Sequence, residues 1–154
     1  MKFHKDLIKS LKLKFRIKYE LKNNFLFVQI RRKDYVDIAK FLKKKGFKRM
    51  LTVSAVDWIK KKKFEVYFLL HHPTENVYIK VATNIPRNKP KIKSLCYLWK
   101  NAEMHEREAW ELFGIDFIGN KMLKPLFLEE WKGMPPFRRD FDSREYVKTV
   151  YKGK

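Results

Sequence analysis

The sequence predicts an α+β fold: an N-terminal β-hairpin, a helix, a mainly antiparallel sheet with helices packed on one face, and a long irregular C-terminal tail. Three observations support this prediction. Several segments before residue 84 repeat with the period of two that is typical of strands, and two other segments have the period of a helix. After Gly114 no regular period continues. We therefore divide the 154 residues into a compact domain, 1–114, and an extended tail, 115–154.

The first predicted element is the β-hairpin. Residues Leu11 to Leu21 alternate between apolar and charged or polar side chains, as in a strand with one buried face and one cationic face. Asn23 and Asn24 follow, and asparagine tolerates the positive φ of a tight turn. The strand-forming residues 25–30 then predict the second strand, so that the hairpin turns at the two asparagines.

The next segment, 34–45, has helical periodicity. Its apolar residues recur at i, i+3, i+4 and i+7, acidic residues lie near its beginning and lysines at its end, and Gly46 is suited to end it. Three strands, a short helix and a longer helix are predicted after it, over residues 48–56, 64–71, 77–83, 92–99 and 101–114.

The tail combines residues that interrupt regular structure with bulky aromatic residues. A long segment without clear elements is unusual in a compact domain. Its aromatic content is nevertheless too high for a disordered segment. We therefore expect the tail to pack against its own domain or against a partner through its aromatic residues, which are Phe117, Phe127, Trp131, Phe137, Phe141, Tyr146 and Tyr151.

The chain is strongly basic, with a formal net charge of +20 and an isoelectric point near 10.0. Residues 1–100 contain 27 Lys and Arg against 7 Asp and Glu, whereas residues 101–154 contain 10 of each. The whole excess therefore lies in the first two thirds of the chain. Composition alone favours a nucleic-acid-binding protein, because basic strands alternate with aromatic residues, but no ordered nucleic-acid motif accompanies it. A lysine-rich chain with a single glutamine is also compatible with a thermophile.

Residue patterns for catalysis or metal binding are sparse. The single cysteine, Cys96, excludes an internal disulfide and a cysteine-built zinc or iron–sulfur site within the chain. His71 and His72 are adjacent at the end of a predicted strand, so their side chains point to opposite faces. Glycine-rich phosphate loops and nucleophile motifs are absent from the sequence. We expect no catalytic residue, bound cofactor or metal site in this chain.

The sequence also carries no signal for a membrane span. Its apolar runs are far shorter than the ~20 residues that cross a bilayer. The N-terminal residues lack the apolar core and the small-residue cleavage site of a signal peptide. We expect a cytoplasmic protein that is soluble or peripheral.

One carboxylate, Glu106, falls on the apolar face of the predicted helix 101–114. A buried carboxylate is unfavourable unless it is paired or hydrogen-bonded. Arg107, Arg138 and Arg139 are candidate partners, because arginine can bind a carboxylate through two parallel hydrogen bonds. The alternative interpretation is a solvated helix face with incidental charges.

The helix and the tail together resemble a known family. Residues 106–117 and 126–140 carry, in order, counterparts of the family pattern E-R-E, D/E-L-F-G, L-P-x-D/E-W and G-x-P-x-R-R/K-D. The third is changed to Leu-Phe-Leu-Glu-Glu-Trp, and the fourth has one extra residue, at Pro136. This order resembles the signature of the thirty-kilodalton subunit of NADH:quinone oxidoreductase, or respiratory complex I. The small subunit of archaeal membrane-bound NiFe-hydrogenase complexes is related to it. In this sequence the motifs comprise Glu106-Arg107-Glu108, Glu111-Leu112-Phe113-Gly114, Leu128-Glu129-Glu130-Trp131 and Pro135-Pro136-Phe137-Arg138-Arg139-Asp140.

The resemblance implies a non-catalytic scaffold in the peripheral, cytoplasmic arm of a membrane-bound oxidoreductase complex, most like an ion-pumping hydrogenase. Its tail would wrap the neighbouring NiFe-hydrogenase-like large subunit, beside iron–sulfur subunits, with the membrane arm contacted only indirectly. The iron–sulfur clusters and a NiFe centre would belong to those partner subunits, and nucleic acid would not be a partner. The residues that we expect at the partner contact are Glu106, Arg107, Glu108, Trp131, Pro135, Pro136, Phe137, Arg138, Arg139 and Asp140.

Overall fold

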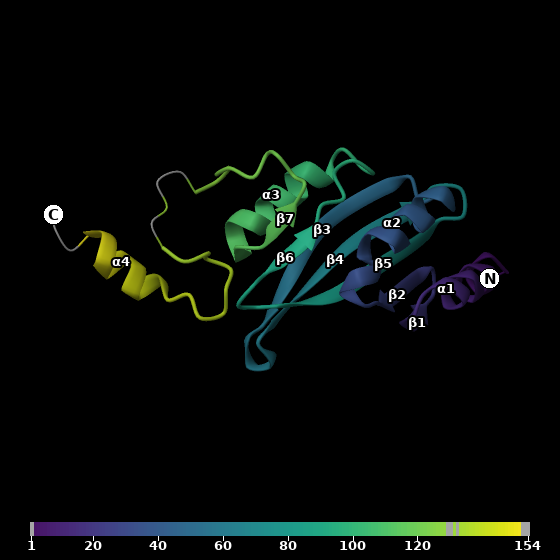
Figure 1. Ribbon diagram of the computed structural model, residues 1–154, viewed down its shortest axis with the longest axis horizontal. Helices are drawn as coiled ribbons and strands as arrows, with labels where there is room; N and C mark the ends of the chain where they lie inside the picture. The colour runs from purple at the N-terminus through teal and green to yellow at the C-terminus, as the bar shows by residue number, and fades with distance from the viewer. Residues whose placement is uncertain (1, 129–130, 132, 152–154) are drawn as a thin grey trace.

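A five-stranded sheet forms the centre of the computed structural model, which describes residues 2–128, 131 and 133–151 (Figure 1). The strands follow the spatial order β1-β2-β5-β4-β3. Only β2 and β5 run parallel, and every other neighbouring pair is antiparallel. The α+β prediction with a mainly antiparallel sheet is therefore confirmed. The strands are β1 Lys18–Lys22, β2 Phe25–Gln29, β3 Arg49–Trp58, β4 Lys63–His72 and β5 Val77–Pro86.

Two helices, α2 (Tyr35–Lys44) and α3 (Ala102–Phe113), cover one face of this sheet (Figure 1). Tyr35 of α2 packs on Phe68 of β4 with ring centroids 5.3 Å apart, and Phe113 of α3 packs on Phe64 at 6.1 Å. Phe64 and Phe68 are an even number of residues apart, so they lie on the same face of β4. Alternate residues of β4 are fully buried there, which places the core between this face and the helices.

The hairpin turn and α2 agree with the sequence prediction. Leu21 pairs with Leu26 and Lys22 with Phe25, and Asn23 has the positive φ of 54° that was expected at this turn. Helix α2 ends before Gly46, whose φ of 99° is accessible to glycine with little strain. Short 3₁₀ turns η1 (Arg32–Asp34) and η2 (Ile59–Lys61) complete this part of the chain.

The predicted strand over Leu11–Leu21 is wrong in its first half, because Lys2–Lys14 form a helix, α1. Leu7 and Leu11, one helical turn apart, are 3% and 0% exposed, whereas Leu13 is 79% exposed. The alternation around Leu13 therefore does not decide which side chains are buried. Lysine and leucine are strong helix formers, and the i, i+4 pair of leucines packs on the core.

The predicted short helix over 92–99 is also wrong. Lys91–Lys93 form strand β6, which pairs in parallel with β7 (Asp116–Ile118), and Ile92 lies opposite Phe117. Both side chains are buried, at 3% and 1% exposure. A turn over residues 95–99 then leads to α3.

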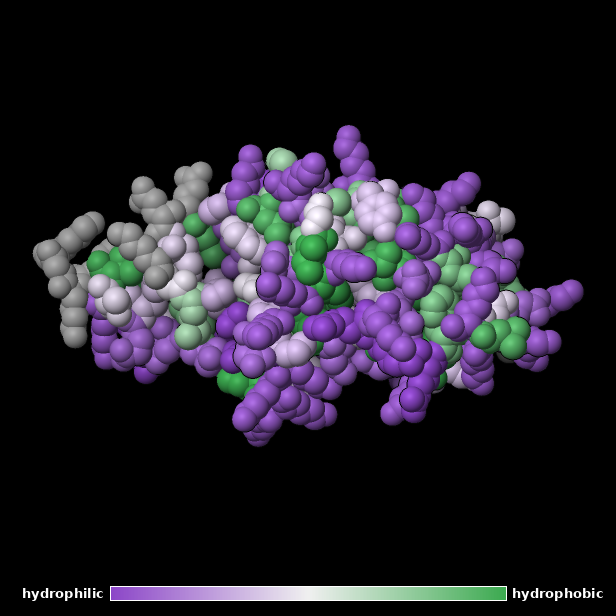
Figure 2. Space-filling model, viewed as in Figure 1, coloured by the Kyte–Doolittle hydropathy of each residue, from purple (hydrophilic) through white to green (hydrophobic). Residues whose placement is uncertain are grey.

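The tail after Gly114 is less irregular than the sequence indicates. It begins with strand β7 and, within the described residues, ends with helix α4 (Ser143–Tyr151), which lies apart from the sheet in Figure 1. The described residues between these elements are largely irregular and are held to α3 at residues 124–128 and 137. Hydrophilic side chains cover most of the face seen in Figure 2, with smaller apolar areas between them. None of the described helices has the length and apolar character that a membrane span requires.

Candidate partner-binding site

Helix α3 holds the first part of the tail through two side chains one turn apart. Arg107 donates from Nε to the carbonyl of Lys124 and from Nη2 to the carbonyl of Pro125, both at 2.6 Å. Glu111, 8% exposed, accepts hydrogen bonds from three successive backbone N–H groups, those of residues 126–128, at 2.6–3.1 Å. The two side chains thus bind donors and acceptors of the main chain of segment 124–128.

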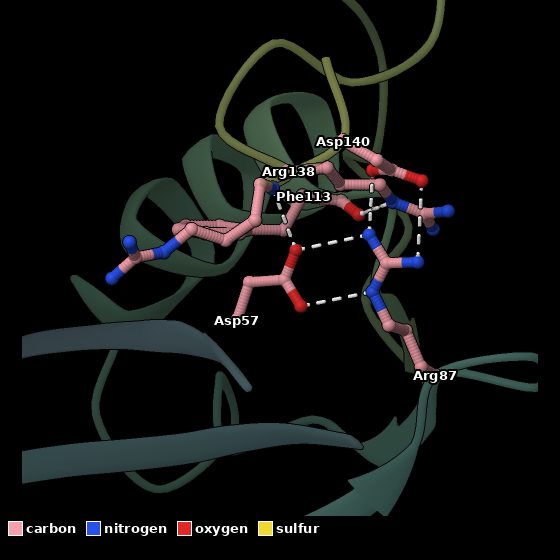
Figure 3. A network of polar contacts seen from close by, with 6 residues as sticks. Asp57, Arg87, Phe113, Arg138 and Asp140 are labelled. Carbon is pink, nitrogen blue, oxygen red and sulfur yellow. Dashed lines mark hydrogen bonds and ion pairs between the residues drawn. The ribbon is translucent and has the colours of Figure 1, made fainter. Parts of the chain in front are cut away.

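The second part of the tail is anchored to the far end of β3 (Figure 3). Asp57, whose side chain is 1% exposed, accepts hydrogen bonds from Nε and Nη2 of Arg87 at 2.9 and 3.0 Å. Nη2 of Arg87 also donates to Asp140 at 2.6 Å. The backbone N–H of Arg139 donates to Asp57 at 2.8 Å. One guanidinium therefore joins the domain carboxylate of Asp57 to the tail carboxylate of Asp140.

The electrostatics of this network favour the charged forms of both carboxylates. Burial alone would raise the pKa of Asp57, but the hydrogen bonds from Arg87 and from the backbone of Arg139 outweigh burial and hold it below its usual value. The hydrogen bond from Arg87 lowers the pKa of Asp140. The bonds to these two carboxylates raise the pKa of Arg87 above its usual value.

Residues next to this network fix the tail against the end of α3. Arg138 donates from Nε to the carbonyl of Phe113 at 2.7 Å, and its guanidinium carbon lies 5.3 Å from the ring centre of Phe64. The N–H of Phe137 donates to the carbonyl of Leu112 at 2.9 Å. Gly114 ends the helix with φ = 77°, and a Cβ there would lie 2.9 Å from the Arg138 guanidinium. It would also lie 2.9 Å from Cγ of Pro135, so a side chain at position 114 would push this part of the tail away from the helix end.

Glu106 is fully buried, as its position on the apolar helix face predicts, but its expected arginine partners are wrong. It accepts hydrogen bonds from Ser94 Oγ at 2.5 Å, from the backbone N–H of Leu95 at 2.6 Å and from Asn120 Nδ2 at 3.0 Å. All three donors are neutral, and burial raises its pKa above the usual value despite these bonds. Glu106 thus links the segment before α3 to the segment after β7.

The other expected contact residues occupy three kinds of position. Trp131 stacks on Tyr146 of α4, with ring centroids 4.0 Å apart, and donates from its indole N–H to the carbonyl of Met134. Pro135 lies against Gly114, and Glu108 and Pro136 are half-buried. The side chain of Arg139 is exposed. Glu129 and Glu130 of the family-like motif lie outside the described residues.

Three large apolar side chains in the part of the tail between residues 124 and 140 are exposed. Phe127, Met134 and Phe137 are 61%, 43% and 58% exposed. The main chain beside each phenylalanine is held by hydrogen bonds to α3, so the exposed rings belong to an anchored segment. We call Phe127, Met134 and Phe137 the tail apolar face. Apolar side chains presented on a fixed backbone are typical of a protein–protein contact.

Sequence reasoning missed five residues that hold the tail or Glu106 in place. Asp57 had a detectable signal, because it continues the inward alternation of Val53 and Ala55 in β3. Glu111 lies four residues after Arg107 on one helix face. The remaining partners come from loops, and no sequence period marks them. The five are Asp57, Arg87, Ser94, Glu111 and Asn120.

Replacing Glu111 with glutamine should loosen the tail without changing the shape of the side chain. The amide nitrogen of glutamine cannot accept, so at least one of the three N–H groups loses its acceptor, at a cost of about 1–3 kcal/mol. Faster hydrogen exchange at residues 126–128 and a lower urea midpoint would show this. Glu108→Gln on the same helix is the control, and equal effects of the two changes would contradict the assigned role of Glu111.

The comparisons with known proteins agree with this fold and tail. A family model described as "Respiratory-chain NADH dehydrogenase, 30 Kd subunit" matches residues 28–147. An NADH-quinone oxidoreductase subunit of Rhizobium rhizogenes is 27% identical over 136 residues, which cover 86% of this chain and 68% of the relative. The corresponding protein of Roseiflexus sp. is 32% identical over 120 residues, which cover 75% of this chain and 68% of the relative. In a further relative, from Rhizobium etli, the match spans 53% of the relative's length.

A solved structure resembles nearly the whole chain. It is a chain of an archaeal respiratory membrane complex, the membrane-bound sulfane sulfur reductase. The two chains superpose with a TM-score of 0.88 and 28% sequence identity, over 99% of this chain and 92% of the other. The likeness thus includes the tail as well as the sheet.

These matches define the class as complex I-type subunits built on one α+β domain with an anchored tail. The chain belongs to the family of the respiratory-chain NADH dehydrogenase 30 kDa subunit.

Proposed function

We propose that this chain is a non-catalytic structural and assembly subunit of a membrane-bound, complex I-related oxidoreductase. Family membership and the similarity to a chain of an archaeal respiratory membrane complex support this role. The observation that carries it is the tail itself. Its main chain is anchored to the domain at residues 124–128 and 137–140, while Phe127, Met134 and Phe137 remain exposed.

The tail apolar face is the surface that we propose for docking on a NiFe-hydrogenase-like large subunit. Buried aromatic residues and arginines usually dominate the energy of such contacts. Phe137 and the exposed side chain of Arg139 are the direct contacts in this proposal. Glu106 and Arg107 act indirectly, because their side chains bond within the chain.

The redox cofactors would belong to the partners in this proposal. Iron–sulfur clusters, and a NiFe centre if the complex is of the hydrogenase type, would be held by the large subunit and its iron–sulfur neighbours. The chain would associate with the cytoplasmic face of the membrane through the complex. Among the described residues no group of three His, Cys, Asp or Glu side chains is arranged to hold a metal ion.

Co-purification tests the proposal. Tagged full-length chain, recovered from gently solubilised membranes, should bring down an iron–sulfur protein and a NiFe-hydrogenase-like large subunit. The double variant Phe127→Ser, Phe137→Ser should reduce their yield by more than about tenfold, because interface hot spots are few and large. Full co-purification of the double variant, or of a chain ending at Gly114, would contradict the proposed docking surface.

A matched control separates docking from folding. Leu13→Ser replaces another exposed apolar side chain, 79% exposed, on α1. It should leave the yield of partner subunits unchanged. The serine variants should unfold at urea midpoints close to that of the parent, because exposed positions contribute little to stability.

Nucleic-acid binding is the alternative that the net charge of +20 favours. It predicts tight binding to single-stranded DNA with a steep dependence on salt concentration, because each neutralised phosphate releases counterions. Saturable binding at physiological salt, without recovery of redox subunits from membranes, would support this alternative over the docking proposal.

A further inference from the structure

A concave, basic surface lies between α2 and β6, and its lining includes none of the residues 124–140 that hold the tail to the domain. It is a groove of about 760 Å³, within the range of volumes that bind ligands or side chains of a partner. One wall comes from η1 and α2, and the other from the loop after β5 and from β6. We call it the basic groove, and its cationic residues are Arg32, Lys33, Lys40, Lys89, Lys91 and Lys93.

The described residues provide these cations with no carboxylate partner at ion-pair distance. All six side chains are exposed, and none forms an ion pair within the part of the chain that the structure describes. Asp37, in the first turn of α2, is the only acidic residue lining the groove among the described residues. Six cations against one carboxylate create a local positive potential that attracts an anionic partner.

Part of the lining of the basic groove is apolar. Ile92 is buried, whereas Tyr97 and Ile118 are 63% and 53% exposed and line the same concave surface. The ammonium group of Lys40 lies 6.0 Å from the ring centre of Tyr97. The groove therefore combines apolar contact surface with cationic side chains, a combination that suits an acidic segment carrying apolar residues.

We infer that the basic groove binds an acidic segment of a partner polypeptide, with its carboxylates on the lysines and an apolar side chain on Tyr97 and Ile118. This inference rests on the proposed function, in which other subunits surround the chain. A single-stranded nucleic acid would need several exposed aromatic rings for stacking, and Tyr97 is the one exposed ring that the described groove offers. A membrane surface is flat, whereas this surface is concave.

Fluorescence anisotropy of the full chain with a labelled synthetic peptide tests the inference. The peptide alternates glutamate with leucine, and a peptide with glutamine in place of glutamate is its neutral counterpart. We expect saturable binding of the acidic peptide and at least about tenfold weaker binding of the neutral one. The triple variant Lys40→Glu, Lys89→Glu, Lys93→Glu should bind the acidic peptide more than about tenfold more weakly than the parent does.

The matched control changes the same net charge elsewhere on the surface. Lys9, Lys48 and Lys60 are exposed and do not line the groove. Their triple replacement by glutamate should change the affinity less than about threefold, because charges beyond a Debye length are screened. Equal losses in the two triple variants would overturn the inference. Tighter groove-dependent binding of oligothymidylate, or of vesicles containing phosphatidylserine, than of the acidic peptide would overturn it as well.

Carbodiimide cross-linking of the purified complex identifies the natural occupant. This reagent joins lysine amines directly to carboxylates in contact, so Lys40, Lys89, Lys91 or Lys93 should be linked to Asp or Glu of another subunit. If the partner subunits are recovered but these lysines remain unlinked, the groove assignment fails and the proposed function stands. If no partner is recovered with the chain, the proposed function fails, and the peptide measurement decides on the groove separately.

Discussion

Replacing Asp57 with asparagine is expected to lower the free energy of unfolding by about 2–4 kcal/mol, because it leaves the Arg87 guanidinium without its buried counter-charge. Asp57 is 5% exposed and accepts two hydrogen bonds from Arg87 and one from the backbone of Arg139. Asparagine can keep only part of this set. Urea unfolding measures the loss, and hydrogen exchange at Arg139 shows whether the tail detaches.

The exposed pair of Lys22 and Glu20 supplies the control for this prediction. Its two side chains are 69% and 62% exposed, so Glu20→Gln should change stability by less than about 0.5 kcal/mol. An Asp57→Asn variant as stable as Glu20→Gln would contradict the anchoring role. The double variant Asp57→Asn, Arg87→Met should recover part of the loss, because it also removes the guanidinium that Asp57 no longer balances and that then pairs with Asp140 alone.

The two carboxylates bound to Arg87, Asp57 and Asp140, give the stability a pH dependence of definite sign. The folded pKa of Asp57 and that of Asp140 lie below their usual values. Their contribution to stability is therefore present above the ordinary aspartate pKa of about 3.9 and is lost as the pH falls through the lowered folded values. The acid side of the stability curve should be shallower in the Asp57→Asn variant.

Glu106→Ala is expected to have the second large effect, a loss of about 2–4 kcal/mol, since it leaves three buried donors without an acceptor and opens a cavity. The donors are Ser94, Leu95 and Asn120, in segments on either side of α3. Urea unfolding again provides the measurement. Glu108→Ala is the control on the same helix, and it should cost less than about 0.5 kcal/mol. Equal losses would remove any special role for Glu106.

The pH signature of Glu106 is opposite to that of Asp57. Burial raises its folded pKa above the usual glutamate value. Its contribution to stability is thus fully present below that usual value and declines as the pH rises through the raised folded value. The parent should lose stability over this interval relative to Glu106→Gln, whose side chain does not titrate. A constant difference between the two across the interval would contradict the raised pKa.

The sequence predicts those elements whose period is set by one buried face. Helix α2 and strands β3, β4 and β5 each bury alternate or helically spaced residues against one core. The end of helix α1 was mistaken for a strand because its last residues, Leu11–Lys14, alternate between leucine and lysine, and the two periods coincide over a few residues. Only tertiary packing distinguishes them, through the burial of Leu7 and Leu11 and the exposure of Leu13.

Strand β6 could not be predicted from local sequence. It has three residues, and its partner strand β7 follows more than twenty positions later. So short a strand carries no readable period, and the hydrogen bonds that define it depend on the fold of the intervening helix. The same reasoning explains why the hydrogen-bond partners of Glu106 were not predicted. Its place on the apolar helix face was readable, but Ser94 and Asn120 are brought to it by the turns around β6 and β7.

The arginines illustrate the limit of charge counting. Arg107, Arg138 and Arg139 were expected to pair with Glu106, yet the described bonds of Arg107 and Arg138 go to backbone carbonyls. Arginine offers five N–H donors and can donate to backbone carbonyls as well as to carboxylates, so its presence does not predict an ion pair. The arginine that does pair with carboxylates is Arg87, between Asp57 and Asp140.

The attachment of residues 124–128 to α3 fixes the path of the backbone independently of the side chains in this segment. Arg107 and Glu111 bind only peptide groups there, so the bonds do not depend on which side chains the segment carries. Substitutions within residues 124–128 therefore leave these backbone hydrogen bonds in place, except that proline at 126–128 would remove an N–H donor. The side chains that this segment presents to a neighbouring subunit can therefore change, while the position of its backbone on α3 stays the same.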